Sequence, residues 1–224
     1  MRVFVIDSGV NPAHSHVEHV AGGVRIFRGA GGGIRRDRLY RDEVGHGTAI
    51  TAVIRHVAPG AEVFAVKIFG RTLTTTPDVL EGALEYAIRS RARIVNLSLA
   101  ITEPHQAGHV GALCREAVRS GVILVAAASA GSRRRGFPAV MPEVIGAITD
   151  ARLGDASLRY RRDALFECRA AGWARPLPGL PREKNFSGHS FAAARVSGTI
   201  ACLLERHPDF DTESVREWLE ARFS

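Results

Sequence analysis

The chain has 224 residues, of which 46% are hydrophobic, enough for one buried core and a single domain over residues 1–224. No run of 18 apolar residues occurs, which argues against a membrane-spanning helix, and the N-terminus lacks the apolar stretch of a signal peptide. The net charge of +7 comes mainly from arginine, and no nucleic-acid-binding motif accompanies it, so we expect neither nucleic acid nor membrane as a partner. The cysteines lack metal-ligand spacing, so we predict reduced structural thiols, no metal or other cofactor, and a cytoplasmic location; they are Cys114, Cys168 and Cys202.

Apolar runs and amphipathic segments alternate along the chain, a pattern typical of a parallel sheet covered by helices. Strands are predicted at residues 3–6, 62–67, 93–97, 122–127 and 144–148. Helical spacing of apolar residues predicts helices at 46–57, 79–88, 110–118, 190–204 and after Asp211. Residues 151–184 are rich in Arg, Gly and Pro and predict irregular loops, with one or two edge strands around 164–168. The expected fold is α/β, with a mostly parallel sheet flanked by helices.

Three short segments place catalytic-type side chains at the ends of these elements. They are V-F-V-I-D-S-G around Asp7, G-H-G-T around His46, and G-H-S-F-A-A-A-R-V-S-G around Ser190. A serine hydroxyl attacks effectively only when a base takes its proton, and that base needs an acceptor that fixes its tautomer. Taken singly, the histidine could be a loop residue and the serine a helix N-cap. Their joint occurrence favours acyl-transfer chemistry.

The order Asp, His, Ser and the spacing of these segments resemble the subtilisin-like serine proteases over nearly the whole chain. The resemblance implies a three-layer fold and a serine endopeptidase that acts on a peptide or protein substrate. It assigns Ser190 as the nucleophile, His46 as the general base and Asp7 as the orienting carboxylate. It also places the backbone N–H of Ser190 in the oxyanion hole, at the start of a helix.

Other segments agree with the resemblance. I-V-N-L-S-L-A resembles the substrate-binding backbone, which implies that an extended peptide would pair with Ser98, Leu99 and Ala100. G-V-I-L-V-A-A-A followed by G-F-P-A resembles the strand and wall of the specificity pocket. Relatives usually carry Gly where Ala100 and Ser129 stand, so we expect a narrower cleft.

The chain departs from the family at the oxyanion hole. Where relatives have Gly-Asn after Ala-Ala-Ala, this sequence has Ser129 and Ala130, so the asparagine that donates to the oxyanion is missing. Either Ser129, Ser132, a backbone N–H or an accessory protein replaces it, or the protein is slow or inactive. The alternative function is therefore a catalytically impaired protein that binds a peptide or partner in its cleft, although the intact triad favours activity. A third hypothesis, a phosphate-handling enzyme that uses Asp7, lacks a second nearby aspartate and a glycine-rich phosphate loop.

A run of arginines gives the sequence a possible substrate preference. In the layout of the family, the loop with this run borders the specificity pocket, and the run consists of Arg133, Arg134 and Arg135. One hypothesis is an acidic substrate residue before the cut; the other is a solvated turn.

Three further features have two interpretations each. The histidines His14, His16 and His19 could suggest a metal site, but they lack a fitting carboxylate or cysteine, and the resemblance accounts for His14. Trp173 and the Pro-rich stretch 176–181 either face the substrate or pack. Ala194 and Arg195 replace the usual Pro-His, and an arginine on a buried helix needs a partner.

The N-terminus suggests how such an enzyme would be used. The chain begins almost at the Asp7 strand, so we expect no pro-domain. We therefore expect a minimal, selective protease that processes one or a few peptides, such as the leader of a peptide natural product.

Overall fold

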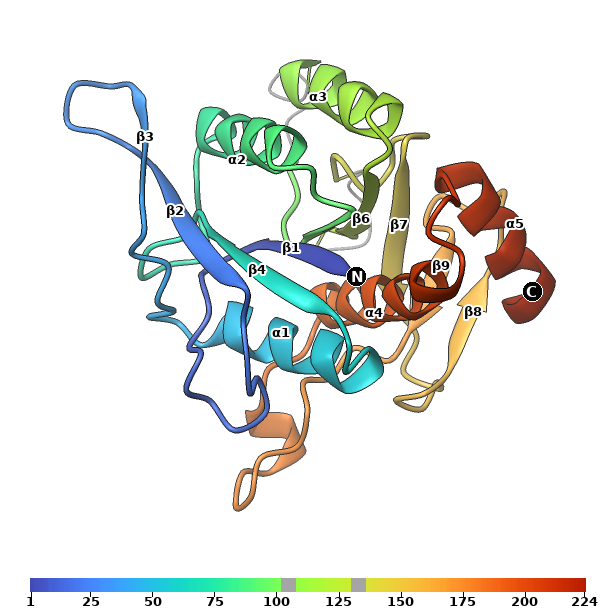
Figure 1. Cartoon of the computed structure of the whole chain (residues 1–224). Coiled ribbons are helices and arrows are strands. Elements are labelled where there is room, and N and C mark those ends of the chain that lie inside the picture. Colours follow the sequence, from blue (N-terminus) through green and yellow to red (C-terminus); the bar gives the residue numbers. More distant parts are fainter. Residues whose placement is uncertain (102–107, 130–135) are drawn as a thin grey trace.

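A computed structural model describes residues 1–101, 108–129 and 136–224, and its sheet has nine strands in the order β3-β2-β4-β1-β5-β6-β7-β9-β8 (Figure 1). The strands are β1 Arg2–Asp7, β2 Gly22–Arg28, β3 Ile34–Asp37, β4 Glu62–Lys67, β5 Ile94–Leu97, β6 Ile123–Ala127, β7 Val144–Thr149, β8 Leu158–Tyr160 and β9 Cys168–Ala170. The seven inner strands are parallel, and the two edge strands, β3 and β8, pair antiparallel with their neighbours. The mostly parallel sheet predicted from the sequence is confirmed.

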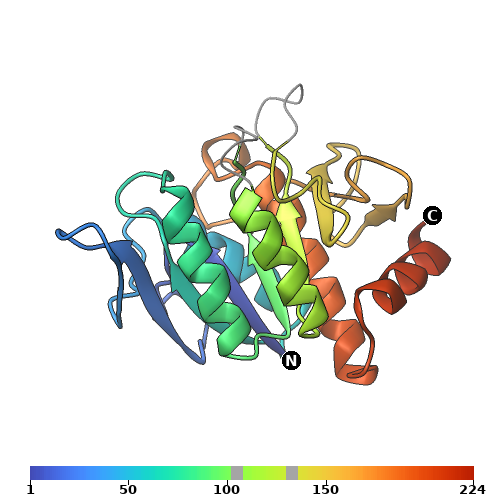
Figure 2. The same ribbon diagram turned by 90° about the horizontal axis from the view of Figure 1, so that it is seen from above.

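Helices cover both faces of this sheet and make a three-layer α/β fold. The helices are α1 His46–Val57, α2 Pro77–Arg89, α3 Gly108–Arg119, α4 His189–Arg206 and α5 Thr212–Phe223. Helices α1 and α4 lie on one face, whereas α2 and α3 lie side by side on the other (Figures 1 and 2). Side chains of β1 alternate between these layers: Val3 and Val5 join the core under α1 and α4, and Phe4 and Ile6 join the core under α2 and α3.

Helix α4 passes through the centre of its layer, as its nearly all-round apolar sequence predicts. Small residues let it approach α1 closely. A Cβ at Gly198 would lie 2.7 Å from the Cβ of Val57 and 3.3 Å from the carbonyl oxygen of Ile54, so a side chain there would push the helices apart. The register of α4 against α1 bears on the candidate site, because each of these helices carries one of its residues in the first turn.

Sequence patterns missed or misplaced several strands near the edges of the sheet. Strands β2 and β3 were not predicted, because β2 starts with two glycines and all four residues of β3 are at least partly exposed. The edge strands predicted around 164–168 lie instead at 158–160 and 168–170. Residues between them form the turn, in which the N–H of Arg161 donates to the carbonyl of Glu167. The turn between β8 and β9 therefore occupies most of the short apolar segment in which a strand was expected.

The remaining global predictions concern the cysteines and the membrane. Cys114 and Cys168 are buried free thiols, and Cys202 is a half-buried one. Burial and the nearby charge of Glu143 raise the pKa of Cys114 to about 12, which keeps this thiol protonated and unreactive. Within the described ranges, the helices are all too short or too polar to cross a bilayer.

Candidate active site

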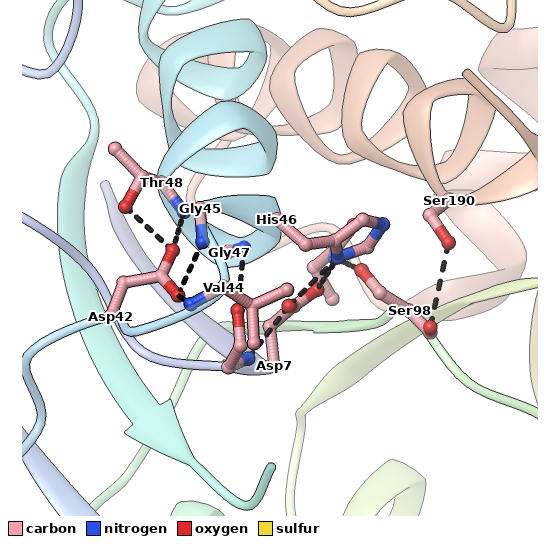
Figure 3. A network of polar contacts seen from close by, with 11 residues as sticks. Asp7, Asp42, Val44, Gly45, His46, Gly47, Thr48, Ser98 and Ser190 are labelled. Atoms are coloured by element: carbon pink, nitrogen blue, oxygen red, sulfur yellow. Dashed lines mark hydrogen bonds and ion pairs between the residues drawn. The ribbon is translucent and has the colours of Figure 1, made fainter. Parts of the chain in front are cut away.

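The three residues of the predicted triad come together at the carboxyl edge of the sheet (Figure 3). Asp7 is the last residue of β1, His46 the first residue of α1, and Ser190 lies in the first turn of α4. Because β1 and α4 both lie at the centre of the fold, the site rests on rigid elements.

Asp7 and His46 form a buried pair. The Nδ1 of His46 lies 2.8 Å from Oδ1 and 3.0 Å from Oδ2 of Asp7, whose side chain is completely buried. The carboxylate accepts the Nδ1–H, which leaves Nε2 as the basic nitrogen of the neutral ring. Burial opposes the charged imidazole, but the charge of Asp7, the hydrogen bond to it and the charge of Asp42 together raise the pKa of His46. The pair is therefore arranged to take up a proton at Nε2.

Backbone and side-chain contacts fix the segment that carries His46. Gly45 has φ +92°, a left-handed conformation that suits glycine. A Cβ at Gly47 would lie 2.2 Å from the carbonyl oxygen of Gly9, and the N–H of Gly47 donates to Ser8 Oγ at 2.9 Å. The backbone conformation at Gly45 and the close approach of the loop after β1 at Gly47 thus favour a glycine on each side of His46.

Asp42 is a functional residue that the sequence analysis missed. Its Oδ1 accepts the N–H groups of Val44 and Gly45, and its Oδ2 accepts the N–H and the hydroxyl of Thr48, all within 2.9 Å. These bonds cap the N-terminus of α1, and the negative charge favours a protonated His46. An aspartate four residues before the histidine was the available signal, but its role depends on the loop conformation.

Ser190 faces the edge of strand β5. Its hydroxyl donates to the carbonyl oxygen of Ser98 at 3.4 Å, and no hydrogen bond to His46 is present among the described residues (Figure 3). The sequence-predicted substrate backbone therefore adjoins the candidate nucleophile. A rotation of the serine side chain would be needed before its proton could pass to His46, a change that substrate binding commonly brings about.

A buried polar network supports the same edge and was also missed. The amide of Asn96 donates to Ser98 Oγ at 3.0 Å, and the hydroxyl of Ser197 donates to Asn96 Oδ1 at 2.9 Å. All three residues are buried, so the bonds tie α4 to β5 directly behind Ser190.

Three residues pack closely where strands β5 and β6 end. A Cβ at Gly136 would lie 2.7 Å from the Cβ of Ser129 and 2.8 Å from that of Ala100. These distances are too short for a side chain, so the space between Ser129 and Ala100 admits only a glycine at position 136. Next to it, Ile101 and Phe137 exchange backbone hydrogen bonds of 2.7 and 2.9 Å. The narrowing of the peptide cleft stays a prediction from the sequence. The other predicted residues of this region lie outside the described ranges; they are Ala130, Ser132, Arg133, Arg134 and Arg135.

Arg195 has the partners that its burial demands. Its guanidinium lies 2.6 Å from Asp155 Oδ1 and donates to the carbonyl oxygens of Asp155, Trp173 and Phe191. The backbone of Trp173 in turn bridges to Ser187, three residues before Ser190. Arg195 therefore joins the serine helix to the strand-like segment that precedes it.

The indole of Trp173 packs against a neighbouring side chain. The guanidinium of Arg182 lies 4.7 Å from the centre of its ring, within the range of a cation–π contact. Leu177 and Leu180, from the Pro-rich stretch, border a cavity that His14 and His16 also line. Burial, together with the charges of Arg175, His14 and His56, lowers the pKa of His16, so this ring is neutral near pH 7.

Known proteins resemble this chain over its whole length. The sequence model of the Subtilase family matches residues 1–222. Subtilisin NAT from Bacillus subtilis subsp. natto is 28% identical, over 99% of this chain and 60% of its own length. Subtilisin from Bacillus pumilus is also 28% identical, over 99% of this chain and 82% of its own. A crystal structure of a cold adapted subtilisin-like serine proteinase superposes with a TM-score of 0.75 at 19% identity, over 99% of this chain and 81% of that one. That structure supports the fold alone, and the chain spans about 60% of the length of the first curated relatives.

Proposed function

The chain belongs to the subtilase family, and on this premise we propose that it is a serine endopeptidase that hydrolyses peptide bonds. The observation that carries the proposal is the buried Asp7–His46 pair, held at 2.8 Å, together with a helix that carries Ser190 in its first turn. Asp7, His46 and Ser190 are the proposed nucleophilic machinery.

In the proposed reaction, Ser190 Oγ attacks the carbonyl carbon of the peptide bond while His46 Nε2 takes its proton. Asp7 holds the ring by its Nδ1–H and stabilises the imidazolium that forms. His46 then gives the proton to the leaving amine, and an acyl-enzyme on Ser190 remains. A water molecule, deprotonated by His46, cleaves this ester and restores the serine.

The negative oxygen of the tetrahedral intermediate needs hydrogen-bond donors. We propose the backbone N–H of Ser190 as one of them, because the first N–H groups of α4 have no carbonyl partner within the helix. In subtilisin, the loss of one side-chain donor costs about 10²–10³-fold in turnover. Ala130 occupies the position of that donor, so Ser129, Ser132 or an accessory protein would have to compensate, or the enzyme is slow.

The narrowing of the cleft predicted from Ala100 and Ser129 would favour a selective enzyme rather than a digestive one. We propose a processing role in the cytoplasm on one or a few peptides, with the run 133–135 favouring an acidic residue before the cut. Ala130 also favours a second candidate, an impaired subtilase that holds a peptide or partner without cleaving it. An impaired subtilase would bind peptides without cleaving them, so no new peptide termini would appear.

Mass spectrometry of a peptide pool tests these alternatives. A proteome-derived peptide mixture is incubated with the purified wild type and with Ser190→Ala, and new termini are sequenced. We expect new termini only with the wild type, enriched for acidic residues before the cut. Identical peptide mixtures with both proteins would support the impaired subtilase. Equal cleavage after Asp, Leu and Arg would reject the acidic preference alone.

A further inference from the structure

A cavity of about 350 Å³ lies next to His46 but outside the proposed catalytic machinery. Helix α1 provides one wall through small side chains, and the loop 174–186 provides the opposite wall through larger apolar ones. The apolar lining residues are Ala49, Ala52, Ala174, Leu177, Leu180 and Phe186. Because the alanines of α1 leave room under the loop, the cavity has the size and character of a ligand site.

The border of the cavity carries positive charge without acidic partners. Within the described residues, the side chain of Lys184 makes neither a hydrogen bond nor an ion pair. Arg175 likewise has no carboxylate partner there, and its guanidinium makes a long 3.5 Å contact with the carbonyl of His16. Asp42 is the one acid in the lining, and both of its oxygens are engaged at the start of α1. An occupant with a negative charge would therefore meet two cations with which no carboxylate of the described residues forms an ion pair.

Phe186 connects the cavity to the catalytic base. Its ring lines the cavity and also meets the ring of His46 edge-on, with centroids 5.7 Å apart. In Figure 3, Gly45 and Thr48, which line the cavity, lie on one side of His46, and Ser98 and Ser190 lie on the other. A polypeptide that crosses Ser190 from the β5 edge and continues past His46 would reach this cavity.

We propose that the cavity binds an apolar side chain of the substrate that is followed by acidic residues. The apolar side chain would enter between α1 and the loop 174–186, and the carboxylates would lie against Arg175 and Lys184. The assignment of this peptide as the substrate rests on the proposed function, whereas the binding preference rests on the cavity itself. A second recognition point of this kind would restrict cleavage to a few sequences.

Fluorescence anisotropy with Ser190→Ala protein tests the preference without catalysis. The probes are two labelled peptide pools that are random except for a central Leu-Asp-Glu or Leu-Lys-Arg. We expect the acidic pool to bind about tenfold more tightly at low salt. Lys184→Glu in the same background should abolish this preference, and Ala49→Leu should weaken binding of both pools by filling the cavity.

A charge-matched control separates the cavity from the general positive charge of the protein. Arg119 is exposed at the end of α3, on the opposite face of the sheet from α1, so Arg119→Glu should leave the preference intact. Equal binding of the two pools, or the same loss in Arg119→Glu as in Lys184→Glu, would overturn the proposal. Labelling of wild-type Ser190 by a fluorophosphonate tests the protease separately, so a failed cavity and a failed protease give different results.

Discussion

The two sides of the candidate site differ: one is held by many hydrogen bonds, and the other departs from the family in sequence. The base side, which comprises Asp7, Ser8, Asp42 and His46, is held by short hydrogen bonds, most of them buried. The oxyanion side, which comprises Ser98–Ala100, Ser129 and Ala130, departs from the family in three of its side chains. A chain that had lost its function would have little reason to keep the base side so fully hydrogen-bonded. We infer that the Asp7–His46 pair is ready to accept a proton once the Ser190 side chain turns toward it, and that the departures from the family at Ala100, Ser129 and Ala130 bear on the opposite side of the site.

The largest expected effect comes from breaking the base side. Asp7→Asn should lower kcat for peptide hydrolysis by about 10⁴-fold, because the amide cannot hold the Nδ1–H tautomer or stabilise the imidazolium. Steady-state kinetics on a peptide cleaved by the wild type measures the change, and circular dichroism checks that the variant is folded. A loss of less than tenfold would mean that His46 does not act with Asp7.

Restoring the oxyanion side should have the next largest effect. Ala130→Asn returns the side chain that relatives carry at this position, and it should raise kcat by about 10- to 10²-fold with little change in KM, because the new bond would form mainly in the transition state. Ala130→Gln serves as a matched variant of the same polarity with a displaced amide. Unchanged kcat in Ala130→Asn would show that another donor already completes the oxyanion hole.

A smaller effect on stability should follow from removal of the cap on α1. Asp42→Ala leaves the N–H groups of Val44, Gly45 and Thr48 without their acceptor and should reduce the free energy of unfolding by about 1–2 kcal/mol. Urea denaturation measures this change. Asp211→Ala, which removes the cap of α5 far from the site, provides a comparison, and it should destabilise the protein without altering the pH dependence of hydrolysis. If Asp42→Ala were as stable as the wild type, the assignment of Asp42 as the cap of α1 would be wrong.

The smallest effect is a shift along the pH axis. The pKa of His46 is raised, and the base must be neutral to accept a proton, so kcat/KM should fall on acidification with a midpoint above 6.5. Because Asp42 contributes to this rise, Asp42→Asn should move the midpoint to lower pH. The same raised pKa contributes to stability below the unfolded value, and that contribution is lost as pH rises through the folded value. An acid limb centred below 6.5 in the wild type would contradict the assignment.

Sequence patterns predicted the parts of the molecule that depend on local periodicity. The helix of His46 and the strand of Asp7 carry continuous apolar patterns, and their ends place both side chains at one edge of the sheet. The glycine-flanked motifs then identified the residues that meet there. Strands β2 and β3 escaped prediction because their pairing, rather than their composition, makes them strands.

Tertiary contacts decide what the sequence could not predict. The bond between Asn96 and Ser197 joins residues 101 positions apart, and Arg195 finds Asp155 across 40 positions, in a loop with no recognisable pattern. The cavity under the loop 174–186 likewise depends on how that loop packs on α1. The roles of Ala130 and of the arginines at 133–135 remain predictions from the sequence.

The most direct test of the account is covalent labelling of the folded protein with a fluorophosphonate, followed by mass spectrometry. The account predicts one adduct, located on Ser190, absent in Ser190→Ala and formed much more slowly in His46→Ala, because attack on phosphorus uses the same nucleophile and base. Folded wild-type protein that forms no adduct, or that labels equally fast without His46, would contradict the claim that Asp7, His46 and Ser190 act together.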